Sequence, residues 1–251
     1  MARYCIVAPP QILTGLQDAG AIGRNHLLLA HDIVRKDRQH IYNMLFDPSS
    51  QLHPYHTQVI LDNGVVETAI PVDLPTMVAA AETVMPTCIV LPDKYYDTDG
   101  TIESCTQALE PWSREFEGIP LMYLPQGKTE NDFFRCATHE PLMSDPRIGW
   151  WGVPRNLTAH HHTRERATRL LHALNPRRKI HLFGFSDNLY DDIICSQLPM
   201  VESIDSAVPV RQTTKFPGPD FVKPRGDWWE KGRLNDLSLY NIHMARTIFG
   251  A

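Results

Sequence analysis

The sequence predicts an α/β protein, most simply a (β/α)8 TIM-type barrel, from three observations. Short apolar runs of about four to six residues recur along the chain, each closed by Pro, Gly, Asp or Gln. Segments with helical patterning separate these runs, and such alternation builds a parallel sheet. The chain has 251 residues, a length at which one barrel buries a full core. We therefore expect a single domain over residues 1–251.

Seven segments fit buried parallel strands, and helical patterning fills the spaces between them. Strands are expected at Tyr4–Ala8, Gln58–Leu61, Thr87–Leu91, Pro120–Leu124, Ile148–Gly152, Lys179–Phe183 and Val201–Ile204. Helices are expected at Leu74–Met85, Thr101–Glu117, Thr129–Met143, His160–Leu174, Asn188–Gln197 and Asp236–Phe249. Because seven strands are found and not eight, the barrel is expected to be irregular, and a doubly wound open sheet is the alternative.

Two stretches lack clean periodicity. Residues 36–57 read as a long, partly ordered early insertion, and residues 209–232, rich in Pro, Gly, Lys and Arg, read as an extended C-terminal surface arm. No GxGxxG or Walker-type loop follows any strand, which disfavours a dinucleotide or nucleotide fold.

Composition excludes several classes. Lys and Arg number 24 against 29 Asp and Glu, a formal charge of −5, with 43% hydrophobic and 21% charged residues. These values are typical of a globular protein and argue against a histone-like nucleic-acid coat, although a local basic face is still compatible with them. Five cysteines stand singly without a CxxC pair, which favours reduced thiols. The N-terminal apolar run is too short for a signal peptide, and no stretch approaches a membrane span. We expect a cytoplasmic protein with no membrane contact.

Polar residues gather where the predicted strands end. Asp62 closes one strand, Asp93 and Gln126 follow two others, and Asp205 lies inside an apolar run. The carboxyl ends of barrel strands meet at one face, so these groups are expected to converge there. Each alone is also an ordinary turn former or helix cap. A carboxylate inside an apolar strand is costly unless it is paired or used.

Three carboxylates and a glutamine, without metal-spaced His or Cys, indicate acid–base and covalent chemistry. One carboxylate is suited to act as a nucleophile and another as a proton shuttle. The third carboxylate and the amide would read the donor and acceptor edge of a purine-like base. Attack of a carboxylate on the sugar carbon of a nucleoside is the logic of retaining glycosyl transfer. We expect no metal and no other cofactor.

Several strand ends resemble those of one enzyme family. The segments VESIDSAVPVR, ILDNG, VLPD, YLPQG, GWWGVP and IHLFGFSD occur in this chain. They are similar to motifs of the tRNA-guanine transglycosylases, barrel enzymes that exchange guanine for a 7-deazaguanine base. The similarity extends over roughly two-thirds of the chain in the family's order, through short motifs. In ILDNG, Asn63 stands where the family has Ser, and Val65 replaces its second Gly.

The resemblance implies a role for each matched position. Asp205 would be the covalent nucleophile and Asp62 the general acid and base. Binding of the base would involve Asn63, Asp93, Gln126, the main chain near Gly152 and Val153, Phe183 as a stacking partner, and Gly184.

Two differences between this sequence and the family's pattern favour one branch of the family. The family's zinc site needs three closely spaced Cys and a His near the C-terminus, and no Cys follows Cys195. The chain is also shorter than a bacterial tRNA enzyme. Both points favour the compact DNA 7-deazaguanine transglycosylases of phage and of bacterial DNA-modification clusters. The expected partners are then DNA with a flipped guanine and a free 7-deazaguanine base, such as 7-cyano-7-deazaguanine. A divergent tRNA enzyme is the alternative within the family.

Nucleic-acid contacts would come from local basic residues, because the overall charge is negative. Candidates are Arg177 and Arg178 in one strand–helix unit that also holds Arg164, and Arg211, Lys215, Lys223 and Arg225 along the arm beside Trp228 and Trp229. The alternative is a solvated basic face with the tryptophans in the core. His31, with Asp32, would line the pocket mouth, or His31 would be a buried, hydrogen-bonded histidine. Two other functions stay open: a barrel glycosidase or lyase acting on a small substrate, and an inactive nucleic-acid-binding module.

Overall fold

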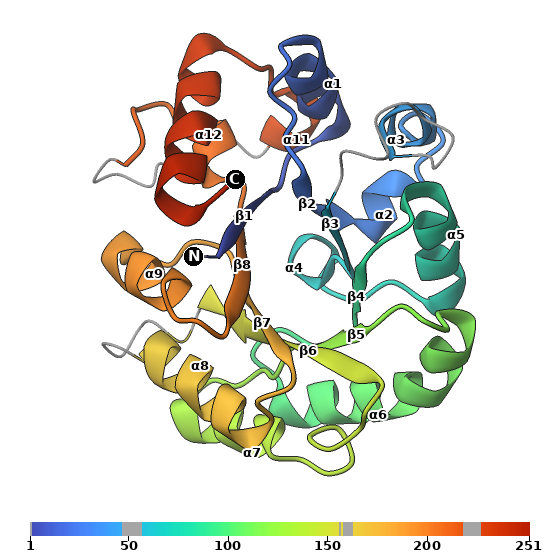
Figure 1. Ribbon diagram of the computed structural model, residues 1–251. Coiled ribbons are helices and arrows are strands. Elements are labelled where there is room, and N and C mark those ends of the chain that lie inside the picture. The colour runs from blue at the N-terminus through green and yellow to red at the C-terminus, as the bar shows by residue number, and fades with distance from the viewer. Residues whose placement is uncertain (1, 47–56, 156, 158–162, 218–226) are drawn as a thin grey trace.

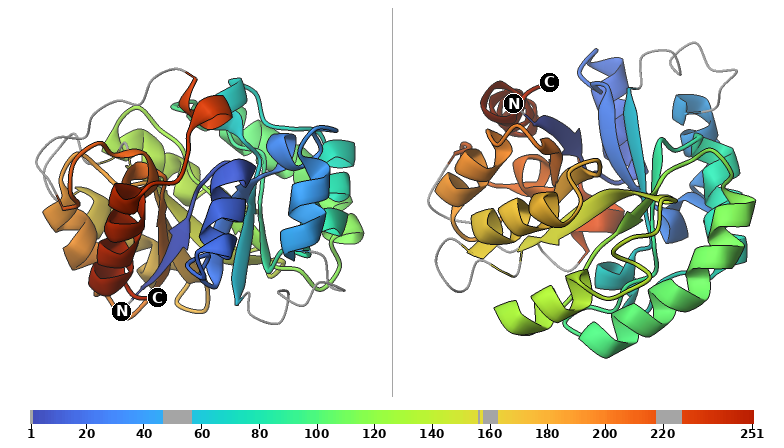
Figure 2. Two further views of the ribbon diagram at one scale, coloured as in Figure 1. Left: turned by 90° about the horizontal axis from the view of Figure 1, so that it is seen from above. Right: turned by 60° about the horizontal axis from the view of Figure 1, so that its bottom comes forward.

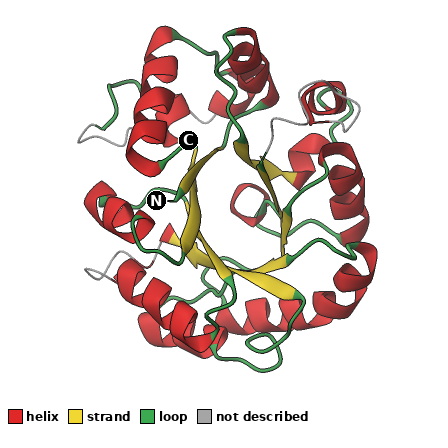
Figure 3. Ribbon diagram, in the orientation of Figure 1, coloured by secondary structure: helices red, strands yellow, loops and turns green. Residues whose placement is uncertain are grey.

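The computed structural model describes residues 2–46, 57–155, 157, 163–217 and 227–251. Eight parallel strands close into a barrel in sequence order, and β1 pairs with β8 to complete it. Helices surround the ring of strands (Figures 1 and 3). The predicted (β/α)8 barrel is therefore confirmed, and the open-sheet alternative is wrong. Within the described ranges, no helix has the length and apolar character needed to cross a membrane.

Each of the seven predicted strands is present, and one strand was missed. The strands are β1 Arg3–Ile6, β2 Asn25–Leu29, β3 Gln58–Asp62, β4 Cys88–Val90, β5 Leu121–Tyr123, β6 Ile148–Pro154, β7 Lys179–Phe183 and β8 Val201–Ser206. The missed strand, β2, opens with the polar residues Asn25 and His26 and runs directly into a helix. Without a turn residue after it, the sequence gives no sign of where this strand stops.

Helices α5 to α9 and α12 were predicted, with ends displaced by a few residues. The described helices are α1 Pro10–Asp18, α2 Ala30–Ile33, α3 Gln39–Phe46, α4 Val65–Thr68, α5 Leu74–Val84, α6 Thr98–Glu115, α7 Glu130–Ala137, α8 Thr163–Leu174, α9 Leu189–Ser196, α10 Val208–Arg211, α11 Trp228–Lys231 and α12 Asp236–Phe249. Helix α6 starts earlier than expected because the Asp97 side chain accepts a hydrogen bond from Gly100 N and caps it.

Both irregular stretches contain more structure than expected. In the supposed insertion, α3 buries Tyr42, Leu45 and Phe46, while residues 47–56 lie outside the described ranges. In the supposed arm, α10 is helical and Phe216 is buried, with its ring stacked on Phe185 at 5.7 Å. The descriptions of these stretches as an unpatterned insertion and an extended surface arm were therefore wrong where the structure describes them, because apolar side chains anchor both.

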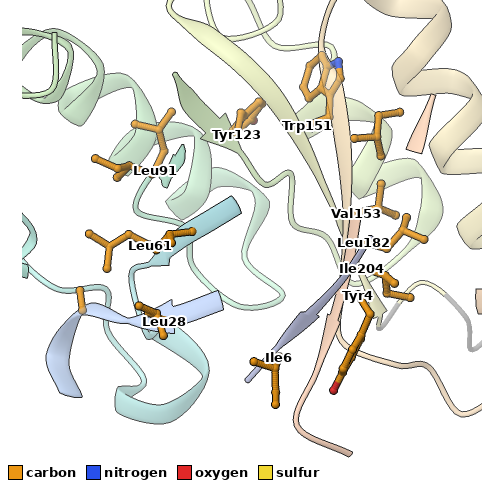
Figure 4. Close-up of a cluster of buried hydrophobic side chains, with 14 of the residues drawn as sticks. Tyr4, Ile6, Leu28, Leu61, Leu91, Tyr123, Trp151, Val153, Leu182 and Ile204 are labelled. Carbon is orange, nitrogen blue, oxygen red and sulfur yellow. The ribbon is translucent and has the colours of Figure 1, made fainter. Parts of the chain in front are cut away.

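Alternation along the strands divides the interior into two layers. One set of residues faces outward beneath the helices, including Tyr4, Ile6, Leu61, Trp151 and Val153 (Figure 4). A second apolar cluster comes from the alternate strand positions and fills the barrel. Its members are Cys5, Val7, Leu27, Leu29, Ile60, Cys88, Val90, Met122, Leu124 and Trp150. All five cysteines are free and buried.

Two short helices, α4 and α11, lie at the carboxyl end of the barrel (Figure 2). Helix α4 lies over the barrel axis in projection (Figure 1), and α4 and α11 lie at the end opposite the two termini (Figure 2, left). Trp229 of α11 packs against the inner cluster, so this helix covers part of the carboxyl end.

Candidate active site

A cavity of about 210 Å³ opens at the carboxyl end of the barrel. Seven sequence-predicted residues line it: Asp62, Asp93, Gln126, Phe183, Gly184, Asp205 and Arg211. They come from the ends of different strands or from the loops that follow them, as expected for a barrel site. The sequence-predicted carboxylates therefore do converge on one pocket.

In the described part of the chain, Asp205 is held through only one of its two carboxylate oxygens. It lies in β8 with 7% exposure. Its Oδ1 atom accepts hydrogen bonds from His181 Nε2 and from the backbone N–H of Gly184, each at 3.0 Å. Both bonds end on the same oxygen, and the described residues offer no hydrogen bond to Oδ2. One oxygen is thus fixed and the other is available to a substrate.

Asp62 carries a carboxyl group that favours its protonated form. Burial raises its pKa well above the usual value, and the nearby carboxylates of Glu67, Asp93 and Asp205 raise it further. Gly64 N donates to Asp62 Oδ2 at 3.3 Å, which opposes that shift only partly. A carboxyl group with a raised pKa is suited to donate a proton, and Asp62 lies in the same pocket as Asp205.

The turn after Asp62 requires glycine at position 64. Gly64 has φ 71°, and a Cβ there would come within 2.3 Å of His31 Nδ1. The Asn-Gly pair of the ILDNG segment therefore has a backbone reason. It allows the chain to reverse into α4 directly above the pocket.

Asp93 is fixed by two side-chain amides. Asn63 Nδ2 donates to its Oδ1 at 2.7 Å, and Gln126 Nε2 donates to its Oδ2 at 2.6 Å. Burial nevertheless raises the pKa of Asp93 to about 6, and the two amides moderate the rise. Asn63 also donates to the Leu91 carbonyl and does not line the cavity. It therefore positions Asp93 and is not itself a substrate contact.

The pocket floor is apolar and its shape depends on Gly152. Val7, Leu27, Leu29, Leu124 and Phe183 line it. Gly152 lies beneath Leu124 and Phe183, and a Cβ there would lie 2.8 Å from each side chain. Gly152 therefore makes room for the predicted stacking residue.

The prediction for Val153 was wrong in its detail. Its side chain belongs to the outer core, and its carbonyl accepts a hydrogen bond from Arg164 Nη2. Strand alternation turns residue 153 away from the barrel axis, so Pro154 and Arg155 line the pocket instead. Arg164 is itself buried beside Asp192 and also binds the carbonyls of Phe183 and Gly184. It braces the ends of β6 and β7, and is not a DNA contact.

Three residues at the pocket mouth were missed by sequence reasoning. Glu67, Tyr95 and Arg155 line the cavity and are exposed to solvent. Arg155 directly follows a strand end, so the strand-end rule could have found it. Glu67 could not be found in that way, because α4 is a single short turn without a periodic pattern.

The predicted nucleic-acid contacts are divided between the two ends of the barrel. Arg211 lines the pocket, half-buried, and has no hydrogen bond or ion pair among the described residues. Lys215 is exposed and lies over the Tyr240 ring at 5.4 Å. Lys223 and Arg225 fall outside the described residues. Arg177 and Arg178 precede β7 and therefore lie at the opposite, amino end of the barrel.

Arg178 has a structural role, so the prediction that it contacts nucleic acid was wrong. It is 4% exposed, its guanidinium lies 4.2 Å from the Trp151 ring centroid, and it donates to the carbonyls of Leu142 and Asp145. Burial of this kind leaves no surface for a phosphate.

Asp32 belongs to a second buried network outside the pocket. It pairs with Arg38 and accepts hydrogen bonds from Tyr42 Oη at 2.7 Å and Trp229 Nε1 at 3.0 Å. This network anchors α11. Trp228 and Trp229 are half-buried and pack against the core from outside it, so the alternative that placed them in the core holds only in part. His31 contacts the Gly64 turn and does not line the cavity. Neither expectation for His31 is met, because its side chain is only half-buried and its Nδ1 atom has no hydrogen-bond partner among the described residues, whereas Asp32 alone joins a buried network.

The described residues contain no candidate metal site, and comparison with known families and curated proteins identifies no relative. Across the described ranges, no group of three or more His, Cys, Asp or Glu side chains is arranged to hold a metal ion. No protein-family model and no curated protein matches the sequence.

Proposed function

We propose that this protein is a DNA-guanine transglycosylase, which exchanges guanine in DNA for a 7-deazaguanine base through a covalent sugar–Asp205 intermediate. The observation that carries the proposal is the arrangement around Asp205. One of its oxygens is fixed by two donors, and Asp62, with a raised pKa, lines the same cavity. This is the pairing of nucleophile and proton donor that retaining glycosyl transfer requires.

The pocket supports recognition of a guanine-like base. Asp93 presents a carboxylate, and Gln126 Oε1 is buried without a hydrogen-bond partner. Both are acceptors, because Gln126 uses its amide N–H groups toward Asp93. Guanine and 7-deazaguanine carry donors at N1 and at the 2-amino group, whereas adenine has an acceptor at N1 and no 2-amino group. An acceptor-rich wall therefore favours guanine over adenine. Phe183 and the apolar floor suit the flat faces of such a base.

The proposed chemistry balances in two displacements. Asp205 Oδ2 attacks C1′ of the flipped nucleotide, the C1′–N9 bond breaks, and its electron pair stays on the guanine that departs with a proton from Asp62. The incoming 7-deazaguanine transfers its N9 proton to Asp62, and N9 attacks C1′. The bond between C1′ and Asp205 then breaks, with net retention at the sugar.

Arg211 favours a polynucleotide over a small sugar substrate. Its guanidinium is half-buried in the pocket lining, and burial and the neighbouring Arg155 lower its pKa. Arg211 forms no hydrogen bond or ion pair among the described residues, so its guanidinium is suited to bind an anion of the substrate. The phosphates that flank a flipped nucleotide supply that anion. We place the reaction in the cytoplasm, where five unpaired thiols stay reduced.

The test is base exchange into duplex DNA. The protein is incubated with DNA and labelled guanine or 7-cyano-7-deazaguanine, and nucleosides are quantified by mass spectrometry. Incorporation by the parent and its loss in Asp205→Asn are expected. Asp191→Asn is the matched control, because Asp191 is similarly buried (5% against 7% for Asp205) but lies on α9 outside the pocket. Exchange into tRNA but not DNA would assign the tRNA reaction instead, and hydrolysis of a free glycoside would assign a glycosidase.

A further inference from the structure

A line of buried polar side chains crosses the barrel interior and ends at Asp205. Gln58 Nε2 lies 2.8 Å from Ser203 Oγ, and Ser203 Oγ lies 2.7 Å from His181 Nδ1. His181 Nε2 then contacts Asp205 Oδ1 at 3.0 Å. Gln58 is 2% exposed, and His181 and Ser203 are fully buried. Strand alternation places all four side chains on the inner face of β3, β7 and β8.

Apolar side chains fill the rest of the barrel interior, so the polar line needs an explanation. The inner cluster around it consists of Cys5, Val90, Met122 and similar residues. Buried polar groups cost free energy unless they are hydrogen-bonded, and in this line only Gln58 Oε1 is buried without a partner among the described residues. The amino-end member, Gln58, lines a separate cavity of about 240 Å³ beside Arg177 and Lys179. The line thus extends from one end of the barrel to the other.

The hydrogen bonds have one consistent direction. Gln58 donates its amide N–H to Ser203 Oγ. The Ser203 hydroxyl also contacts the Cys5 thiol, and along this line its hydrogen is donated to His181 Nδ1. The His181 proton must then lie on Nε2, from which it donates to Asp205 Oδ1. An Asp205 carboxylate can only accept, so the two ends of the line demand the same tautomer. That tautomer is assigned from the network of hydrogen bonds.

We propose that Gln58, Ser203 and His181 form a positioning relay that sets the His181 tautomer and so presents Asp205 for attack. The proposal rests on the proposed function for its kinetic consequence. His181 and Gly184 N together fix Oδ1 of Asp205 and turn Oδ2 toward the cavity. Without the relay, the His181 ring can present an unprotonated nitrogen to the carboxylate. Two acceptors would then face each other, and Asp205 would lose its orientation.

The first test reads the tautomer directly and does not depend on activity. The protein is labelled with 15N-histidine, and two-bond correlations between ring nitrogens and ring protons are recorded at neutral pH. The His181 signal is identified by its loss in His181→Gln. The relay predicts a neutral ring protonated at Nε2 in the parent, and a mixture of tautomers in Ser203→Ala. A ring protonated at Nδ1 in the parent, or a tautomer unchanged by Ser203→Ala, overturns the proposal.

The second test is kinetic and uses paired variants. His181→Leu removes the donor to Asp205, and we expect the rate of covalent adduct formation with DNA to fall about 100-fold. His181→Gln keeps an N–H donor and should recover a large part of that loss. Ser203→Ala should lower the rate about tenfold, while Ser196→Ala, which alters another fully buried serine on α9, leaves it unchanged. Because the relay acts on the nucleophile and not on the base pocket, the dissociation constant of the free base, measured directly, should stay within about twofold in all four variants.

These outcomes separate the relay from the function. An inactive parent with the predicted tautomer would refute the proposed function and leave the relay in place. An active parent in which Leu and Gln at position 181 reduce the rate equally, or in which the dissociation constant of the base rises with the loss of rate, would refute the relay and leave the function in place.

Discussion

Replacing Asp93 by Asn should remove a specific pH dependence from the stability of the fold. Burial raises the pKa of Asp93 from its ordinary value of 3.8 to about 6, despite hydrogen bonds from Asn63 and Gln126. Between these two pKa values, the Asp93 carboxyl group is therefore protonated in the native state and ionised in the unfolded chain. Where the native state binds more protons, the free energy of unfolding falls as the pH rises. The contribution of Asp93 is greatest in acid and is lost as the pH rises through about 6.

The size of the effect follows from the two pKa values. Between pH 5 and pH 8 the parent should lose about 1.4 kcal/mol of unfolding free energy through Asp93 alone. Asp93→Asn has no such loss. The stability of the variant relative to the parent should therefore rise by about 1.4 kcal/mol from pH 5 to pH 8, because titrations elsewhere largely cancel in the difference.

Urea unfolding of both proteins at the two pH values measures this difference. Asp99→Asn is the control, because Asp99 is exposed and its bond to Arg135 lowers its pKa. The stability of that variant relative to the parent should not change between the same pH values. If the difference between Asp93→Asn and the parent is the same at both pH values, Asp93 is not the strained buried carboxyl that the pocket geometry implies.

Three further changes test other parts of the site. In Gly152→Ala, the new Cβ would lie 2.8 Å from Phe183, so the KM for the base should rise about tenfold in steady-state assays; an unchanged KM would exclude Phe183 as a stacking surface. Gly64→Ala places a side chain at φ 71° and should lower the unfolding free energy by about 2 kcal/mol, measured by denaturant titration; a neutral result would show that the turn relaxes freely. In Arg211→Ala, the slope of log K for DNA against log salt should shrink by about one, and Arg177→Ala at the opposite end of the barrel should leave it unchanged; equal effects would place the DNA elsewhere.

The strand-end residues of the site were predictable from sequence, for a geometric reason. A parallel barrel brings the carboxyl end of every strand to one face. The convergence of Asp62, Asp93, Gln126 and Asp205 could therefore be predicted without knowing any distance between them. The strand pattern also predicted the barrel itself. Strand β2 was not predicted, because it begins with the polar residues Asn25 and His26 and no turn residue follows it.

Which way each side chain points was harder to predict. Val153 faces the outer core and Gly152 the barrel, a distinction that needs the exact register of β6. His181 escaped notice although it lies two residues before Phe183, on the same face of β7. The burial of Arg178 was equally hidden, because it depends on the Trp151 ring and two distant carbonyls.

The central claim is that Asp205 forms a bond to a DNA sugar, and trapping that bond tests it most directly. The protein is mixed with guanine-containing duplex DNA, denatured, digested and analysed by peptide mass spectrometry. We expect a deoxyribose adduct on Asp205 that survives denaturation and disappears when free 7-deazaguanine is added before denaturation. An adduct on another residue, or base exchange that proceeds at the parent rate in Asp205→Asn, would contradict it.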